Sequence, residues 1–107
     1  HTPDGLENVL RTVKEFAVGK VWCVFGCGGD RDRTKRPLMG KIAARYSDHS
    51  FITSDNPRTE DPKVILKDIE QGLIDEGVPA ERYELIVDRR TAIHKAVEMA
   101  SPDDVVL

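Results

Sequence analysis

Two polar stretches of the chain carry residue types that can bind a small charged molecule. The first is the turn Asp55-Asn56-Pro57-Arg58, which offers a carboxylate, an amide, a rigid proline and a guanidinium. A planar guanidinium matches a carboxylate through two parallel hydrogen bonds, and the Asp55 carboxylate or the Asn56 carbonyl can receive an ammonium. The turn is therefore suited to a zwitterion, although a ligand-free Asp-Asn-Pro turn with an exposed arginine has the same composition.

The second stretch is the glycine-rich, charge-dense run over residues 26–36. Its three glycines, Gly26, Gly28 and Gly29, permit backbone conformations in which consecutive N–H groups converge on an anion. Residues 30–36 then carry four positive and two negative charges, in a chain whose net charge is −3. The run matches neither the P-loop pattern nor G-x-G-x-x-G. It indicates an anion-binding loop, with a solvated, salt-bridged loop as the alternative.

Alternating helical and strand-like segments must position these two stretches. Apolar residues recur at helical spacing in four segments, and four short apolar runs between them are typical of strands. The expected helices cover residues 3–18, 37–46, 62–76 and 89–100, and the expected strands cover residues 21–25, 50–53, 83–87 and 105–107. Both polar stretches follow a strand and precede a helix, so we expect them at the carboxyl edge of one sheet, where such folds bind ligands.

This alternation predicts an α/β fold, namely a Rossmann-like, mainly parallel sheet with helices on both faces. With 107 residues the chain is long enough for one domain and one core. It opens on a helix and ends on an apolar run, so we expect residues 1–107 to be one domain that is truncated at both ends.

Composition and spacing exclude several other classes. The acidic balance argues against a nucleic-acid-binding protein. No apolar run reaches the roughly 18 residues of a membrane helix, and the first residues lack the order of a signal peptide, so we expect a cytoplasmic protein. Cys23 and Cys27 lack metal-site spacing and the histidines do not cluster near them, so no metal site is expected.

The residues of both stretches resemble a known family. The run from Val24 to Gly40, followed by the run from Thr53 to Arg58, is similar to the C-terminal domain of MurE-type Mur ligases, and the opening His1-Thr2-Pro3-Asp4 fits the same domain. The resemblance implies part of an ATP-dependent ligase of bacterial cell-wall (peptidoglycan) synthesis. Such ligases add meso-2,6-diaminopimelate, or L-lysine in some members, to UDP-MurNAc-L-Ala-D-Glu.

The resemblance also implies roles for particular residues. Arg31 matches the arginine that holds a carboxylate of the incoming amino acid, and Asp55, Asn56, Pro57 and Arg58 match the motif that recognises its distal end. Arginine at the fourth motif position is the diaminopimelate version. His1 and Asp4 correspond to the segment that approaches the nucleotide.

No catalytic residue is expected in this stretch of the ligase, because the resemblance assigns the ATP and Mg²⁺ sites mainly to a central domain. We therefore expect the chain alone to be inactive, and its partners to be small-molecule substrates and the other domains of the ligase. Three alternatives remain open: a non-catalytic homologue with an interaction role, a lysine-adding ligase, and an independent phosphate-binding module.

Overall fold

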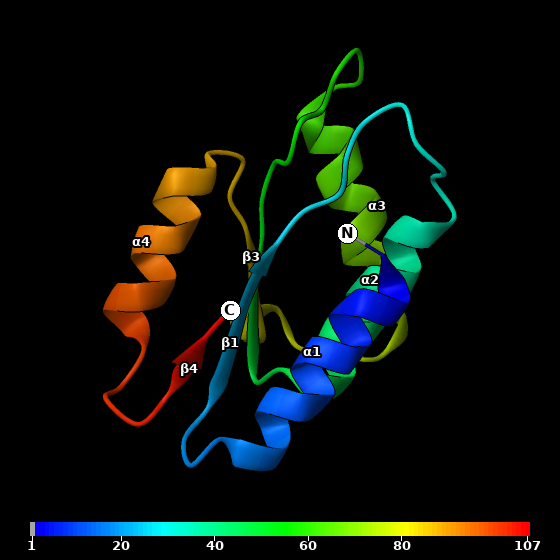
Figure 1. The fold of residues 1–107 in the computed structure, drawn as a ribbon. Helices are drawn as coiled ribbons and strands as arrows, with labels where there is room; N and C mark the ends of the chain where they lie inside the picture. Colours follow the sequence, from blue (N-terminus) through cyan, green and yellow to red (C-terminus); the bar gives the residue numbers. More distant parts are fainter. Residues whose placement is uncertain (1) are drawn as a thin grey trace.

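Helices and strands alternate along the chain in the computed structural model, which describes residues 2–107 (Figure 1). None of the helices within residues 2–107 has the length and apolar character needed to cross a membrane. In chain order the elements are α1 (Pro3–Phe16), β1 (Val21–Phe25), α2 (Lys35–Tyr46), β2 (His49–Ile52), α3 (Pro62–Asp75), the 3-10 turn η1 (Ala80–Arg82), β3 (Tyr83–Leu85), α4 (Arg89–Met99) and β4 (Val105–Val106).

The strands form one parallel sheet in the order β3-β2-β1-β4. Cα pairing sets Phe25, the last residue of β1, opposite Ile52, the last residue of β2. The loops that follow these two strands therefore start level with each other. The predicted α/β fold with a mainly parallel sheet is confirmed.

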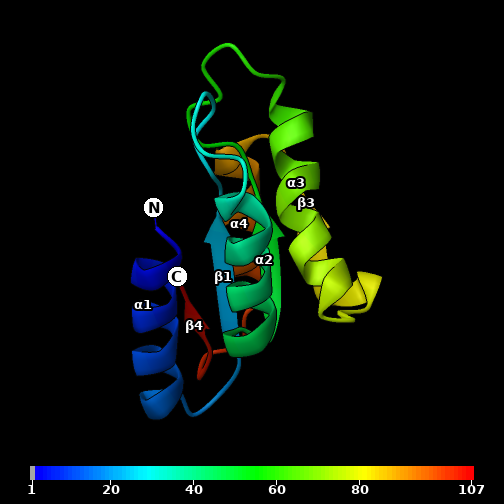
Figure 2. The same ribbon diagram turned by 90° about the vertical axis from the view of Figure 1, so that its right-hand side faces the viewer.

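The two faces of the sheet are covered by different helices, as predicted. α1, α2 and α3 lie on one side of the strands and α4 on the other (Figures 1 and 2). Side chains of β1 alternate between the faces: Cys23 packs in a cluster with Leu10 of α1, whereas Trp22 packs with Phe51 and with Ala92 of α4. This two-sided burial explains why the strands read as continuous apolar runs instead of alternating ones.

The observed elements differ from the expected ones mainly at their ends. α2 begins at Lys35, two residues before the predicted start. The Asp32 carboxylate accepts hydrogen bonds from the Thr34 N–H at 3.0 Å and the Thr34 hydroxyl at 2.6 Å, which folds the chain into a turn ahead of the helix. η1 was not predicted, and β3 ends at Leu85 although the Ile86 N–H still bonds to the Ile52 carbonyl at 2.8 Å.

Two glycines set how closely α2 and α3 pack. A Cβ atom added to Gly40 would collide with the Ile69 carbonyl oxygen, and one added to Gly72 would collide with the Pro37 carbonyl oxygen. Both glycines are buried within helices, Gly40 in the middle of α2 and Gly72 in the last turn of α3, and glycine is otherwise unfavourable in a helix. Close helix contact is therefore the reason for glycine at these positions, and it holds the start of α2 against α3.

Gly40→Ala should lower the free energy of unfolding of the protein by about 1–3 kcal/mol, because the helices must move apart. This loss is opposite in sign to the gain of about 1 kcal/mol that replacing glycine by alanine normally brings in a helix interior. Chemical denaturation measures the free energy of unfolding of both proteins. In the control Gly5→Ala, the new Cβ meets the Thr2 hydroxyl, a side-chain atom, at 3.0 Å, so any loss of stability should be clearly smaller; an equal loss in both variants would contradict the packing argument.

Candidate functional site

The glycine-rich loop and the Asp-Asn-Pro-Arg turn leave the carboxyl edge of the sheet side by side (Figures 1 and 2). The Thr53 N–H donates to the Phe25 carbonyl at 2.9 Å, so the two chains are still paired where the strands end. A side chain at Gly26 would collide with the Thr53 carbonyl oxygen. Glycine at this position therefore allows the two loops to start in contact.

Further contacts join the loops beyond the sheet. The Gly29 N–H donates to the Asn56 carbonyl at 2.9 Å, and Arg58 Nη1 donates to the Gly29 carbonyl at 2.8 Å. A Cβ atom at Gly29 would collide with the Pro57 carbonyl oxygen. The conformational freedom of the glycine-rich loop is thus used to bring it against the turn.

Backbone strain is concentrated in the same two loops. Within residues 2–107, the non-glycine residues with positive φ are Asp30 (54°), Asn56 (47°) and Arg58 (52°). Asp and Asn tolerate this left-handed region, whereas a long side chain such as that of Arg58 seldom adopts it. Strained backbone of this kind persists where the surrounding contacts determine it, and it is common at binding sites.

The loops and the start of α2 enclose a cavity of about 560 Å³. Arg31 and Arg58 both line it, and both approach Gly28: a Cβ atom built on Gly28 would lie 3.6 Å from Arg31 Cγ and 2.9 Å from Arg58 Nη1. The two guanidinium-bearing side chains are therefore on the same side of the molecule. The full set of lining residues is Thr2, Cys27, Gly28, Arg31, Asp32, Lys35, Arg36, Met39, Asp55, Asn56 and Arg58.

The other residues singled out from the sequence are placed as follows. Asp55 and Asn56 line the cavity, and the Asp55 carboxylate forms an ion pair with Arg89 Nη1 of α4 at 3.1 Å. Pro57 does not line it; its carbonyl accepts the Glu60 N–H at 3.0 Å and shapes the turn. Asp4 is exposed in the first turn of α1 and is not among the lining residues, and His1 lies outside the described residues.

The positive surplus of residues 30–36 is divided between two tasks. Arg33 pairs with Asp68 of α3, with Nη2 at 3.1 Å from Oδ2, and Arg36 also pairs with Asp68. Arg31 and Lys35 line the cavity, and Arg36 does so as well. The salt-bridged interpretation therefore holds for Arg33 and Arg36, and anion binding by the run stays a prediction.

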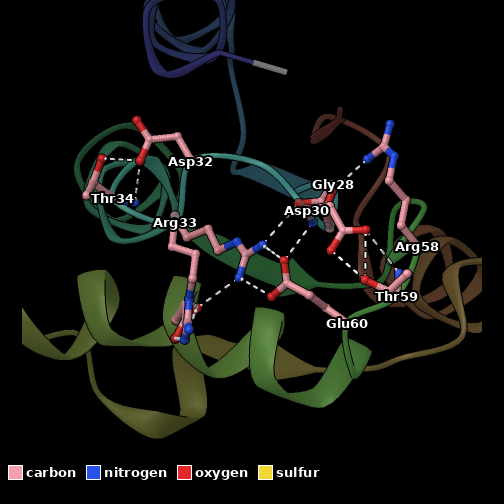
Figure 3. A network of polar contacts seen from close by, with 11 residues as sticks. Gly28, Asp30, Asp32, Arg33, Thr34, Arg58, Thr59 and Glu60 are labelled. Atoms are coloured by element: carbon pink, nitrogen blue, oxygen red, sulfur yellow. Dashed lines mark hydrogen bonds and ion pairs between the residues drawn. The ribbon is translucent and has the colours of Figure 1, made fainter.

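Glu60 is the acid that links the two loops. Its carboxylate accepts the Asp30 N–H at 2.6 Å and two hydrogen bonds from the buried Arg36 guanidinium, at 2.7 and 3.0 Å. The Arg36 bonds first, and the Asp30 N–H second, lower the pKa of Glu60 to about 2. Figure 3 shows the Asp30 and Thr59 side chains directed at each other, with the Thr59 hydroxyl donating to the Asp30 carboxylate at 2.7 Å.

Several residues of the site were missed from the sequence. The sequence places Arg36 only within the charged run 26–36, and it gives no sign of the role of Glu60. Thr2, Cys27 and Met39 also line the cavity. Burial raises the pKa of the Cys27 thiol to about 11, and its Sγ lies 3.4 Å from Met39 Sδ, so this corner of the cavity is apolar and the thiol protonated.

The fold defines the class of protein: an α/β domain whose all-parallel sheet carries a charged cavity at its carboxyl edge. A family model described as "Mur ligase, glutamate ligase domain" matches residues 1–107. The chain belongs to this family, and the resemblance seen in the two motifs is confirmed.

Individual relatives have closely similar sequences and the same fold. A UDP-N-acetylmuramoyl-L-alanyl-D-glutamate--2,6-diaminopimelate ligase of Clostridioides difficile is 58% identical over all of this chain and 22% of its own length. The ligase of that name from Bacillus cereus is 53% identical over 21% of its length. A solved structure of such a ligase, 50% identical, matches with a TM-score of 0.89 over 99% of this chain and 21% of its own. The chain thus spans about one fifth of the length of these relatives.

Acid should destabilise the protein through Glu60. Its folded-state pKa lies near 2 and its usual value is 4.5, so the unfolded chain binds more protons in this window and the free energy of unfolding falls as the pH is lowered. Glu60→Gln should reduce the slope of stability against pH between about 4.5 and 2, as measured by denaturant unfolding at several pH values. Parallel curves for the two proteins would contradict the assigned pairing.

Proposed function

We propose that residues 1–107 are an amino-acid-binding part of the C-terminal domain of an ATP-dependent ligase that adds meso-2,6-diaminopimelate to UDP-MurNAc-L-Ala-D-Glu in peptidoglycan synthesis. The observation that carries the proposal is the placement of Arg31 and Arg58 beside Gly28 in one cavity. Diaminopimelate has a carboxylate at each end, so it offers one partner to each guanidinium. The names of relatives that are 53–58% identical support the same substrate.

The remaining groups of the cavity suit the ammonium ends of the same molecule. Asp55 supplies a carboxylate and Asn56 an amide from the same turn. Arg58 has five N–H donors, of which Nη1 bonds to the Gly29 carbonyl, so the guanidinium is held in place while it binds a carboxylate. In this proposal Pro57 shapes the turn and does not touch the ligand, and Asp4 and His1 stay proposals on the nucleotide side.

The chemistry in the proposed reaction belongs largely to groups outside this chain. ATP phosphorylates the glutamate side-chain carboxylate, and the amine of the bound amino acid then attacks the acyl phosphate and displaces phosphate. Within residues 2–107 no group of three His, Cys, Asp or Glu side chains is placed to hold a metal ion. ATP and Mg²⁺ are assigned to another domain, and the chain alone is expected to be inactive.

The proposed role of the chain is to hold and orient the amine donor. Its partners are then meso-diaminopimelate, UDP-MurNAc-dipeptide, ATP and the other domains of the ligase. A cytoplasmic location belongs to the same proposal, because ATP and UDP-linked sugars are available there. An L-lysine-adding ligase is the alternative. Lysine has only one carboxylate, so such a ligase would need only one guanidinium to bind it.

Arg58→Ala in the full-length protein should weaken the use of diaminopimelate by about 2–5 kcal/mol, because the distal carboxylate loses its partner. L-Lysine has no distal carboxylate, so its much slower use should change far less. The measurement is phosphate release with UDP-MurNAc-dipeptide and ATP, comparing kcat/KM for the two amino acids.

Arg11→Ala is the matched control, since Arg11 pairs with Glu7 at 2.7 Å on the outer surface of α1 and does not line the cavity. It should leave both kcat/KM values unchanged. Equal rates with lysine and diaminopimelate in the unaltered protein would overturn the proposed substrate, and an unchanged preference in Arg58→Ala would overturn the role of Arg58.

A further inference from the structure

A buried guanidinium in the wall of the cavity connects three segments of the protein. The Arg36 side chain is 1% exposed. Nη2 lies 2.7 Å from Glu60 Oε1 and donates to the Gly28 carbonyl at 3.2 Å, while Nη1 lies 3.0 Å from both Glu60 Oε2 and Asp68 Oδ2. Arg36 therefore bonds to the glycine-rich loop, to the loop that follows the Asp-Asn-Pro-Arg turn, and to α3.

Glu60 also bonds to Asp30, the residue that precedes Arg31. Its Oε1 atom accepts the Asp30 N–H as well as Arg36 Nη2. The Asp30 carboxylate in turn accepts the Thr59 hydroxyl at 2.7 Å and the Thr59 N–H at 3.3 Å. Asp30 is thereby held with φ at 54°, and this backbone conformation sets the direction in which Arg31 leaves the loop.

The same guanidinium acts on the position of Arg58. Arg58 Nη1 donates to the Gly29 carbonyl, and Gly29 lies between Gly28 and Asp30, the two loop residues held by Arg36 and Glu60. Arg58 is also two residues from Glu60 in the chain. A shift of the Arg36–Glu60 pair would therefore move both cavity arginines.

We propose that Arg36 and Glu60 are positioning residues that fix the separation and direction of Arg31 and Arg58, and so determine how well the site binds an amino acid with two carboxylates. This inference rests on the proposed function, since it concerns the same cavity. Arg36 also lines the cavity, but its terminal nitrogens are bonded to Glu60, Asp68 and the Gly28 carbonyl. In this proposal Arg36 and Glu60 therefore do not act as ligands. Their role is to fix the distance between Arg31 and Arg58, the two residues that bind the ligand.

Asp68 allows this role to be separated from a purely structural one. It also accepts hydrogen bonds from Arg36 and from Arg33, at 3.0 and 3.2 Å. Within residues 2–107, however, its hydrogen bonds join it to side chains of α2 and the preceding turn, and not to the backbone of residues 28–30. Loss of Asp68 weakens the support of Arg36, while loss of Glu60 also releases the Asp30 N–H.

The test compares Glu60→Gln, Asp68→Asn and Glu76→Gln in the full-length protein. In Glu60→Gln one oxygen becomes NH₂, which must face an N–H donor in either orientation, because both carboxylate oxygens are acceptors. Glu76→Gln is the matched control: Glu76 also pairs with an arginine of α2, Arg45, at 2.8 Å, but away from the cavity. The readouts are Tm, KM for diaminopimelate and for ATP, and hydrogen exchange of the backbone amides of residues 28–31.

Glu60→Gln is expected to raise KM for meso-diaminopimelate by about tenfold, with KM for ATP within about twofold, as for one buried hydrogen bond left unsatisfied. Exchange at residues 28–31 should accelerate in the same variant. Asp68→Asn should lower Tm as much but raise KM for diaminopimelate far less, and Glu76→Gln should change neither KM. A rise in KM that simply follows the loss of Tm across the variants, or no rise in Glu60→Gln, would overturn the positioning role.

The exchange measurement separates this inference from the proposed function. If the unaltered protein released no phosphate with diaminopimelate, the proposed substrate would be wrong, and exchange alone would decide the role of the pair. Faster exchange at residues 28–31 in Glu60→Gln but not in Asp68→Asn would still support the positioning role of Arg36 and Glu60. Unchanged protection of these amides would overturn that role whatever the substrate.

Discussion

The burial of one positive charge, that of Arg36, constrains the whole carboxyl edge of the sheet. A guanidinium removed from water must keep its charge compensated and its N–H donors bonded, or the fold loses several kcal/mol. Glu60, Asp68 and the Gly28 carbonyl compensate the charge and bond to both terminal nitrogens, whereas the buried Nε has no hydrogen-bond partner among residues 2–107. These groups come from three different segments of the chain. Because all three groups must stay hydrogen-bonded to Arg36, the two loops and α3 are held together as one unit.

This constraint explains how the loops sustain an unfavourable backbone. Asp30, Asn56 and Arg58 all have positive φ, and each lies within two residues of a contact that joins the loops. Residues of one chemical type consequently have different tasks: Arg33 pairs with an acid of the scaffold, Arg31 and Arg58 line the cavity, and Arg36 does both. A high density of arginine in a loop is therefore not by itself a measure of its affinity for anions.

Much of the fold was predictable, because it follows from local patterns. Continuous apolar runs such as residues 21–25 identified buried parallel strands, and the position of both polar stretches after a strand placed them at one edge. The network of Arg36 and Glu60 was not predictable from composition. It depends on the distance between α2 and α3, which Gly40 and Gly72 set through contacts between helices, and on a helix start at Lys35 that the proline at position 37 obscured.

The central claim is that two guanidinium groups from neighbouring loops hold the two carboxylates of one amino acid. A crystal structure of the full-length protein with meso-diaminopimelate tests it most directly. The account predicts one carboxylate at hydrogen-bonding distance, about 3 Å, from the Arg31 guanidinium and the other at the same distance from that of Arg58. Diaminopimelate bound in this cavity with either arginine facing away from it, or bound elsewhere on the protein, would contradict the account.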